Sequence, residues 1–193
     1  MTDQQDIELE YKFLVKDKMS LIRLLNNKSN QTGERQYQSN VMFDNPQKLM
    51  QTTNGRVRVR KLGSDGKKIL TYKKHLPPEN GAKREIEYEV NLDDPKDQIE
   101  KILGAIEFTP STSYERYQTK WILGTVHVTL DEYPFGDFVE IEGKKMDIEK
   151  VSQELGFNLS NGLTRPIDTL FQEWRKAQGL GFKPQMKFDD FNK

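Results

Sequence analysis

The segment Ile7-Glu8-Leu9-Glu10-Tyr11-Lys12-Phe13-Leu14 decides how the rest of the chain is interpreted. Apolar and charged side chains alternate strictly along it, which predicts a β-strand, because successive residues of a strand point to opposite faces. One face carries Leu9, Tyr11 and Phe13, and the other carries Glu8, Glu10 and Lys12. In a single strand, a charged face of this kind is typical of a surface in contact with solvent. The pattern becomes informative when further strands repeat it.

The same alternation recurs along the chain. The charged positions on the later segments are Arg56/Arg58/Arg60, Glu85/Glu87/Glu89, Arg116/Lys120 and Glu140/Glu142. The intervening positions are apolar, as in Val57/Val59 and Val139/Ile141, and the predicted helices are amphipathic. An inverted barrel accounts for both observations, with helices covering an apolar outside and a charged bore inside. Eight strands leave room inside for side chains or for one small ligand.

Turn and capping signals place the remaining elements between these segments. Further strands are expected over 35–43, 69–75, 113–122 and 125–132, and helices over 18–27, 93–103, 147–155 and 166–176, with a hairpin turn at 64–66 and a loop at 76–81. The predicted fold class is therefore α+β, an eight-stranded antiparallel closed barrel with a charged interior and helices packed outside. Residues 1–178 are expected to form this domain, and residues 179–193 a flexible C-terminal tail.

Composition excludes several classes of protein. The 193 residues contain 30 Lys and Arg against 30 Asp and Glu, so a net excess of charge for nucleic acid or an acidic membrane is missing. The absence of cysteine excludes disulfides and thiolate metal sites. No apolar run approaches the roughly 20 residues that span a bilayer, and the polar N-terminus is unlike a secretory signal. We expect a cytoplasmic monomer or homodimer without a nucleic-acid or membrane partner.

The charged faces contain both halves of a site for a metal-bound triphosphate. Carboxylates two residues apart on a strand lie about 6–7 Å apart, so Glu8/Glu10 and Glu140/Glu142, joined by Asp131, form a cluster of oxygen ligands that suits Mg²⁺ or Mn²⁺. The interior cations are Lys12, Arg58, Arg60, Lys73 and Arg116. Crowded cations repel one another unless a polyanion joins them. A triphosphate with its metal ion satisfies both sets of charges.

These residues carry a resemblance to the CYTH superfamily, also called triphosphate tunnel metalloenzymes. The segment from Ile7 to Lys12 resembles its N-terminal Glu-x-Glu-x-Lys signature, and the likeness continues in order through Val57-Arg58-Val59-Arg60, Leu70-Thr71-Tyr72-Lys73, Glu87-Tyr88-Glu89 and Arg116 to about residue 172. The block from Asp131 to Glu142 is most similar to the branch that contains the class IV adenylyl cyclases. The resemblance implies an eight-stranded antiparallel tunnel.

The resemblance also implies a role for each matching residue. Glu8, Glu10, Asp131, Glu140 and Glu142 match metal-binding carboxylates; Lys12, Arg58, Arg60, Lys73 and Arg116 match cations that grip the triphosphate; Glu87 and Glu89 match acidic positions on the tunnel wall that also meet the substrate. Within these sets, Glu8, Glu10, Lys12 and Arg58 are the predicted catalytic residues. The chain departs from the family pattern at Tyr114, where a lysine is frequent, and at Arg165-Pro166, and both departures bear on substrate specificity.

Four functions are compatible with a charged site of this kind. The leading hypothesis is a triphosphatase that uses Mg²⁺ or Mn²⁺ to release phosphate from a nucleoside, thiamine or inorganic triphosphate. The alternative is a class IV adenylyl cyclase that converts ATP to cyclic AMP and pyrophosphate. An inert polyphosphate- or nucleotide-binding module would be expected to lose the metal carboxylates, which are all present, and an RNA-binding surface lacks aromatic residues among its arginines. We interpret His75 and His127 as incidental strand residues.

Overall fold

The computed structural model describes residues 7–29, 31–63, 67–79, 82–94 and 96–191, although the side chains of residues 7, 8, 31, 32, 79 and 82 are not part of that description. The predicted hairpin turn at 64–66, the end of the predicted loop at 80–81 and Pro95 at the predicted helix start lie outside the described residues. Within them, no helix combines the length and the apolar character that a membrane crossing requires.

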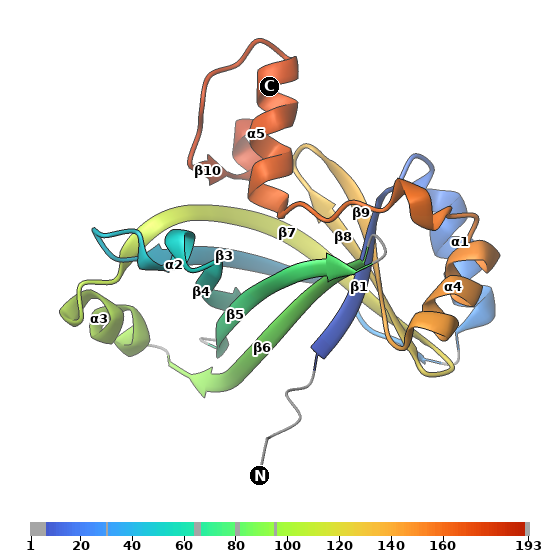
Figure 1. The fold of residues 1–193 in the computed structure, drawn as a ribbon, viewed down its shortest axis with the longest axis horizontal. Coiled ribbons are helices and arrows are strands. Elements are labelled where there is room, and N and C mark those ends of the chain that lie inside the picture. Colours follow the sequence, from blue (N-terminus) through green and yellow to red (C-terminus); the bar gives the residue numbers. More distant parts are fainter. Residues whose placement is uncertain (1–6, 30, 64–66, 80–81, 95, 192–193) are drawn as a thin grey trace.

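Eight strands form the body of the molecule (Figure 1). They are β1 (Ile7–Leu14), β3 (Gln36–Asp44), β4 (Gly55–Leu62), β5 (Lys67–Glu79), β6 (Ala82–Asp93), β7 (Thr109–Leu123), β8 (Val126–Tyr133) and β9 (Gly136–Glu142). Their spatial order is β7-β3-β4-β5-β6-β1-β9-β8, and β8 pairs with β7 again, so the ring is closed. All pairs of neighbours in the ring are antiparallel. The predicted closed barrel is confirmed.

Helices cover the apolar outer face of the ring, as the alternation predicts. The described residues contain α1 (Lys18–Lys28), α2 (Leu49–Thr52), α3 (Gln98–Ala105), α4 (Lys145–Glu154) and α5 (Ile167–Ala177). In Figure 1, α1 and α4 lie together at one end of the barrel and α3 lies at the other end. Phe13 of β1 packs in one cluster with Leu25 of α1 and Ile148 of α4, while Val59 of β4 packs with Leu103 of α3.

Of the element boundaries that differ from the sequence-based expectation, two have a local explanation. The predicted loop at 76–81 is wrong for its first part, because β5 continues to Glu79 and pairs there with Ala82. The pairing is irregular between Leu76 and Glu79, which accommodates two prolines that lack the N–H for a regular ladder. Helix α3 begins at Gln98 rather than near residue 93, and the Asp94 carboxylate accepts hydrogen bonds from its first backbone N–H groups.

The C-terminal segment packs against the barrel. Its strand β10 (Gln185–Met186) pairs in parallel with β7, and the 3₁₀-helix η2 (Phe188–Asp190) follows; the other short elements are β2 (Gln31–Thr32), which pairs with β7, and η1 (Leu159–Asn161). Met186 is buried in a cluster with Phe171 of α5, and Phe191 packs against the same cluster. Apolar contacts of Met186 and Phe191 therefore hold this part of the predicted tail against the barrel.

Candidate active site

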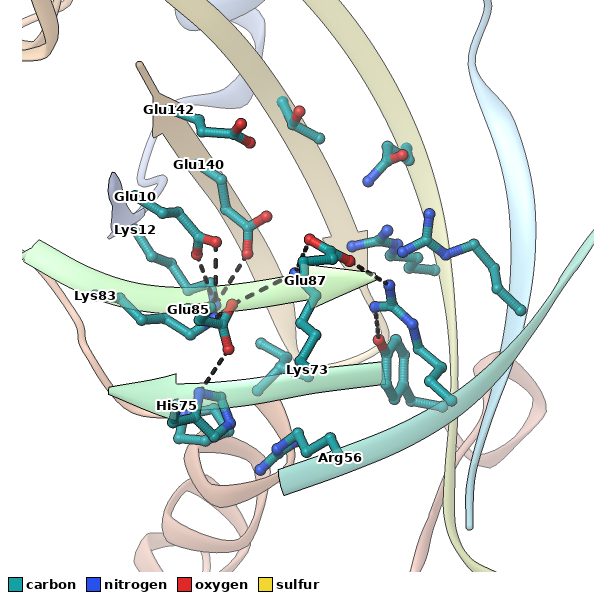
Figure 2. Close-up of a pocket in the computed structure, with 18 of the residues that line it drawn as sticks. Glu10, Lys12, Arg56, Lys73, His75, Lys83, Glu85, Glu87, Glu140 and Glu142 are labelled. Atoms are coloured by element: carbon teal, nitrogen blue, oxygen red, sulfur yellow. Dashed lines mark hydrogen bonds and ion pairs between the residues drawn. The ribbon is translucent and has the colours of Figure 1, made fainter. Parts of the chain in front are cut away.

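The inward faces of the ring strands enclose a charged cavity of about 240 Å³. Because every second residue of a strand points inward, the charged alternation of the sequence becomes the lining of this cavity. Its charged lining residues are Glu10, Lys12, Arg56, Arg58, Arg60, Lys73, Lys83, Glu85, Glu87, Glu89, Arg116, Lys120, Glu140 and Glu142. Figure 2 shows Glu10, Glu140 and Glu142 on one side, with Lys12, Lys73 and Lys83 reaching toward the same space. We refer to this cavity as the tunnel.

The carboxylates of the tunnel are set by the pairing of β1 with β9. Glu10 lies opposite Glu142 and Lys12 lies opposite Glu140. Lys12 Nζ, on a side chain that is only 4% exposed, is 2.9 Å from Glu140 Oε1 and 3.6 Å from Glu10 Oε1. Burial lowers the pKa of Lys12, but Glu140 and Glu10 outweigh it, so the pKa is raised above its usual value. Lys12 is therefore held charged beside the two carboxylates.

Glu142 shows what happens where a tunnel carboxylate lacks such a cation. Burial raises the pKa of Glu142, and the nearby charge of Glu10 raises it further. The opposite direction holds for Glu140: burial raises its pKa, but Lys12 and other cations outweigh burial and lower it. Clustered carboxylates with one member short of positive charge are suited to receive a cation.

The cations of the tunnel crowd one another on the opposing strands. Arg58 and Arg60 come from β4 and Arg116 comes from β7, and all three side chains are buried. Burial, together with the charges of Arg58 and Arg116, lowers the pKa of Arg60 to about 10. The carboxylates of β6 relieve part of this repulsion, since Arg58 Nη2 is 3.3 Å from Glu89 Oε1 and Lys73 Nζ is 2.6 Å from Glu87 Oε2. The remaining excess of positive charge favours an anion in the tunnel.

The structure brings together all the predicted site residues whose side chains it describes, except Asp131. Asp131 is completely buried and is not among the residues that line the tunnel. Its Oδ2 accepts a hydrogen bond from Arg116 Nη1 over 2.6 Å, and its Oδ1 accepts one from Gln118 Nε2 over 2.9 Å. In this arrangement Asp131 orients Arg116. The backbone of Glu8 lies on β1 opposite Glu85, and its side chain is outside the described part.

Other residues that line the tunnel lie outside the predicted catalytic, substrate and metal sets, among them His75, Lys83 and Tyr114. His75 Nδ1 is 2.5 Å from Glu85 Oε1, and Lys83 Nζ is 2.7 Å from Glu85 Oε2. His75 lies two residues after Lys73 on β5, and Lys83 lies four residues before Glu87 on β6, so both side chains point inward. This even spacing is the sequence signal that could have identified them. Tyr114 also lines the tunnel, at the position where the family resemblance makes a lysine the frequent residue. Of the Arg165-Pro166 departure, Pro166 reaches the tunnel wall, whereas Arg165 is exposed and pairs with Glu173.

The donor set fits a hard divalent ion that enters with its ligand. Among the described residues, no group of three or more Asp, Glu or His side chains is arranged to hold a metal ion by itself. Glu10 Oε1, however, is buried and has no hydrogen-bond partner among the residues that the structure describes. Mg²⁺ in phosphate-handling sites is commonly held by one or two carboxylates together with substrate phosphates. Glu10, Glu140 and Glu142 are the residues that would hold such an ion.

Comparison with known proteins finds solved structures with a similar fold. No curated protein matches this chain by sequence. Among solved structures, a candidate adenylate cyclase from Vibrio parahaemolyticus is similar, with a TM-score of 0.74, 17% identity and coverage of 88% of this chain and 99% of that chain. A protein from Pyrococcus horikoshii gives 0.69 at 23% identity, covering 82% and 96%. A candidate adenylyl cyclase from Hippeastrum, reported to have a dominant triphosphatase activity, gives 0.62 at 16% identity, covering 93% and 99%.

These identities are low, so the likenesses show a shared fold. The family model of the CYTH domain matches residues 6–160, which is most of the chain. The match begins at the first strand of the ring, includes the carboxylate and arginine segments described above, and ends after the last strand of the ring. The protein therefore belongs to the CYTH domain family.

Proposed function

We propose that the protein is a divalent-metal-dependent triphosphatase that binds a triphosphate inside the tunnel and releases phosphate. The observation that carries this proposal is the division of the tunnel into two charged walls. Arg58, Arg60 and Arg116 lie close enough that the pKa of Arg60 is lowered by burial and by the other two, while Glu10, Glu140 and Glu142 line the other side. A triphosphate with a metal ion supplies the missing charge to each wall.

The residues of the chain would share the work as follows. The guanidinium groups of Arg58, Arg60 and Arg116 bind phosphate oxygens and stabilise the negative charge that spreads over them during cleavage. Lys12 and Lys73, both held charged by tunnel carboxylates, orient the phosphate chain. The divalent ion, when bound, neutralises phosphate charge and lowers the pKa of a coordinated water. Glu10, Glu140 and Glu142 would hold that ion, and Asp131 keeps the Arg116 fork aligned through its 2.6 Å contact.

The size and lining of the tunnel support a triphosphatase before a cyclase. A cavity of about 240 Å³ lined mainly by charged side chains accommodates a phosphate chain, and it offers little apolar surface for a nucleobase. One observation favours adenylyl cyclase as the second candidate. A neighbouring cavity of about 630 Å³ shares Arg56, His75 and Pro166 with the tunnel and is lined in part by Met50 and Phe182. It offers space in which the organic part of a nucleotide could lie.

A product assay separates the candidates. The purified protein is incubated with Mg²⁺ or Mn²⁺ and, in turn, ATP, GTP, thiamine triphosphate and tripolyphosphate, with a chelator as the metal-free control. Release of orthophosphate is the expected result. Cyclic AMP with pyrophosphate would support the cyclase instead. Binding of these compounds without any product, in the presence of either metal, would contradict both enzymatic proposals and leave an inert binding module.

A further inference from the structure

Tyr114 places a phenol among the arginines of the tunnel. Its side chain is 5% exposed and lines the cavity. Strand β7 sets it two residues from Arg116, on the same inward face, and Arg58 Nη1 donates a hydrogen bond to the Tyr114 hydroxyl over 3.3 Å. The family resemblance leads one to expect a lysine at this position. The chain therefore carries a group that can gain or lose a proton where a permanent cation is frequent.

The surroundings of this hydroxyl are rich in donors. A guanidinium group has only N–H donors and no acceptor, so an arginine can serve the oxygen of Tyr114 but not its proton. In the part of the chain that the structure describes, the Tyr114 hydroxyl accepts the bond from Arg58 and donates none. The nearby carboxylates already have partners: Asp131 accepts from Arg116 and Gln118, and Glu89 accepts from Thr71.

The charges around Tyr114 also favour loss of its proton, because they lower its pKa. Burial raises the pKa of Tyr114, but Arg58, Arg116 and Arg60 outweigh burial, and the pKa lies below the usual value of about 10. Tyr133, whose ring packs edge-on against the Tyr114 ring, shows the reverse. Burial and the charge of Asp131 raise the pKa of Tyr133. The two neighbouring phenols differ because Tyr114 faces the arginines and Tyr133 faces a carboxylate.

The elements packed against Tyr114 divide into charged and apolar ones. The charged and titratable groups are Arg58 and Arg60 on β4, Arg116 on β7, Tyr133 and Asp131 on β8, and, through their pairing with Arg58, Glu87 and Glu89 on β6. Strand β3, helix α5 and strand β10 contribute Met42, Ile167 and Met186, which are apolar. An acceptor for the proton of the Tyr114 hydroxyl can therefore be supplied by a ligand that enters the tunnel.

We propose that Tyr114 is a proton-exchanging contact for the triphosphate. In the free tunnel Tyr114 is a phenolate, whose oxygen accepts the hydrogen bond from Arg58. When a triphosphate occupies the guanidinium groups, the Tyr114 oxygen takes one proton from solvent and donates it in a hydrogen bond to a phosphate oxygen. No covalent bond of the ligand changes in this step. The role rests on the proposed function, because it requires a phosphate chain in the tunnel.

The protonation of Tyr114 would make the affinity for the triphosphate depend on pH. The phosphates cancel the field of the arginines, so the pKa of Tyr114 rises on binding, and one proton is taken up in the interval between the free and the bound pKa. By linkage, the dissociation constant for the triphosphate then increases about tenfold per pH unit across that interval. Without the hydroxyl, this contribution to the pH dependence disappears.

The first test uses the free protein. The ultraviolet absorbance of tyrosinate is followed against pH in the unmodified protein, in Tyr114→Phe, and in Tyr88→Phe as a control, since Tyr88 lies on the exposed outer face of β6. We expect one tyrosine to ionise at a lower pH than the others, to be missing in Tyr114→Phe and to be retained in Tyr88→Phe. Identical titration curves for the unmodified protein and Tyr114→Phe in this early phase would overturn the proposal.

The second test measures protons on binding. Tripolyphosphate is titrated calorimetrically into the three proteins in a chelator, at a pH just above that early phase where it is complete, in two buffers of different ionisation enthalpy. We expect the proton uptake per bound tripolyphosphate to be larger by about one proton in the unmodified protein and in Tyr88→Phe than in Tyr114→Phe. Equal uptake in all three proteins would overturn the role of Tyr114 and leave the proposed function intact. Failure of tripolyphosphate to bind the unmodified protein in the chelator would overturn this contact, and failure to bind with Mg²⁺ as well would also contradict the proposed function.

Discussion

Glu87 illustrates how a single residue connects the charge of the tunnel to pH. One of its carboxylate oxygens is 2.6 Å from Lys73 Nζ, and the other is 3.7 Å from Arg58 Nη2. Burial raises the pKa of Glu87 to about 7; Lys73 opposes this rise, and the adjacent Glu89 adds to it. Near neutral pH, Glu87 therefore changes between an anion that competes with phosphate for these cations and a neutral acid that does not.

The stability of the metal-free protein should carry the signature of Glu87. Because its folded-state pKa of about 7 lies above the ordinary 4.5, the folded protein holds this proton more tightly than the unfolded chain. The free energy of unfolding contributed by Glu87 is then fully present below pH 4.5 and is lost as pH rises to about 7. Denaturant unfolding of the unmodified protein and Glu87→Gln measures it. The stability difference between them should change across this interval, and a constant difference would contradict the raised pKa.

At this scale, the alternation of charged residues predicted which side chains enter the tunnel. It could not predict what each side chain contacts there. Asp131 and Arg116 lie 15 residues apart, and only the pairing of β7 with β8 shows that they neutralise each other. His75 has the same explanation, because its contact with Glu85 depends on the pairing of β5 with β6.

At the scale of elements, strand β1 contributes both to the tunnel and to the apolar core between the barrel and the helices. Its inner face carries Glu10 and Lys12 to the tunnel, and its outer face carries Phe13 to the helices, where the Phe13 ring stacks on Phe157 with centroids 4.8 Å apart. Loss of the outer contact should therefore loosen the strand that positions the carboxylates. A one-residue shift of this strand would exchange its two faces.

Phe13→Ala should lower the free energy of unfolding by about 3–5 kcal/mol, because it removes a large side chain that is 2% exposed from a packed core. Leu14→Ala is the matched control on the same strand, since Leu14 is 52% exposed, and it should change stability by no more than about 0.5 kcal/mol. Denaturant melts of both variants measure the difference. Equal stability of the two variants would mean that the outer face of β1 is not the buried one.

The elements that could be predicted from sequence are those with strong periodicity or clear caps. Helix α1, expected over 18–27, has Asp17 as its N-cap, and the Asp17 carboxylate accepts a hydrogen bond from the backbone N–H of Ser20. The prolines of β5 predict a loop, but they are accommodated within the strand because its pairing with β6 is irregular there. The aspartates before α3 predict a helix start, but the helix begins only at Gln98, where Asp94 accepts hydrogen bonds from the first backbone N–H groups. The short strand β10 has no periodicity to detect, and burial of Met186 is a tertiary effect.

For the whole molecule, the net charge of zero conceals a separation of charge inside the barrel. Ring closure sets β4, which carries Arg58 and Arg60, across from β9, which carries Glu140 and Glu142, so these arginines and carboxylates are not paired with one another through neighbouring strands. The number of strands and their inside-out character followed from the sequence. The shape of the tunnel, and the second cavity at its mouth, depend on how the helices and the C-terminal segment pack, and local pattern does not contain that information.

The central claim is that one wall of the tunnel binds a metal ion and the other binds phosphate. The most direct measurement is a paired steady-state titration, of Mg²⁺ and of the triphosphate that the product assay identifies, on the unmodified protein, Glu140→Gln, Arg58→Ala and Lys61→Ala. Lys61 is the control because it is exposed on the same strand as Arg58.

Glu140→Gln is expected to weaken the dependence of the rate on Mg²⁺ and to lower turnover. Arg58→Ala should leave the Mg²⁺ requirement largely unchanged and raise the triphosphate requirement about 10- to 150-fold, which corresponds to a charge-assisted hydrogen bond of about 1.5–3 kcal/mol. Lys61→Ala should match the unmodified protein. Unaltered metal dependence and rate in Glu140→Gln, or an Arg58→Ala variant indistinguishable from Lys61→Ala, would contradict the two-walled tunnel.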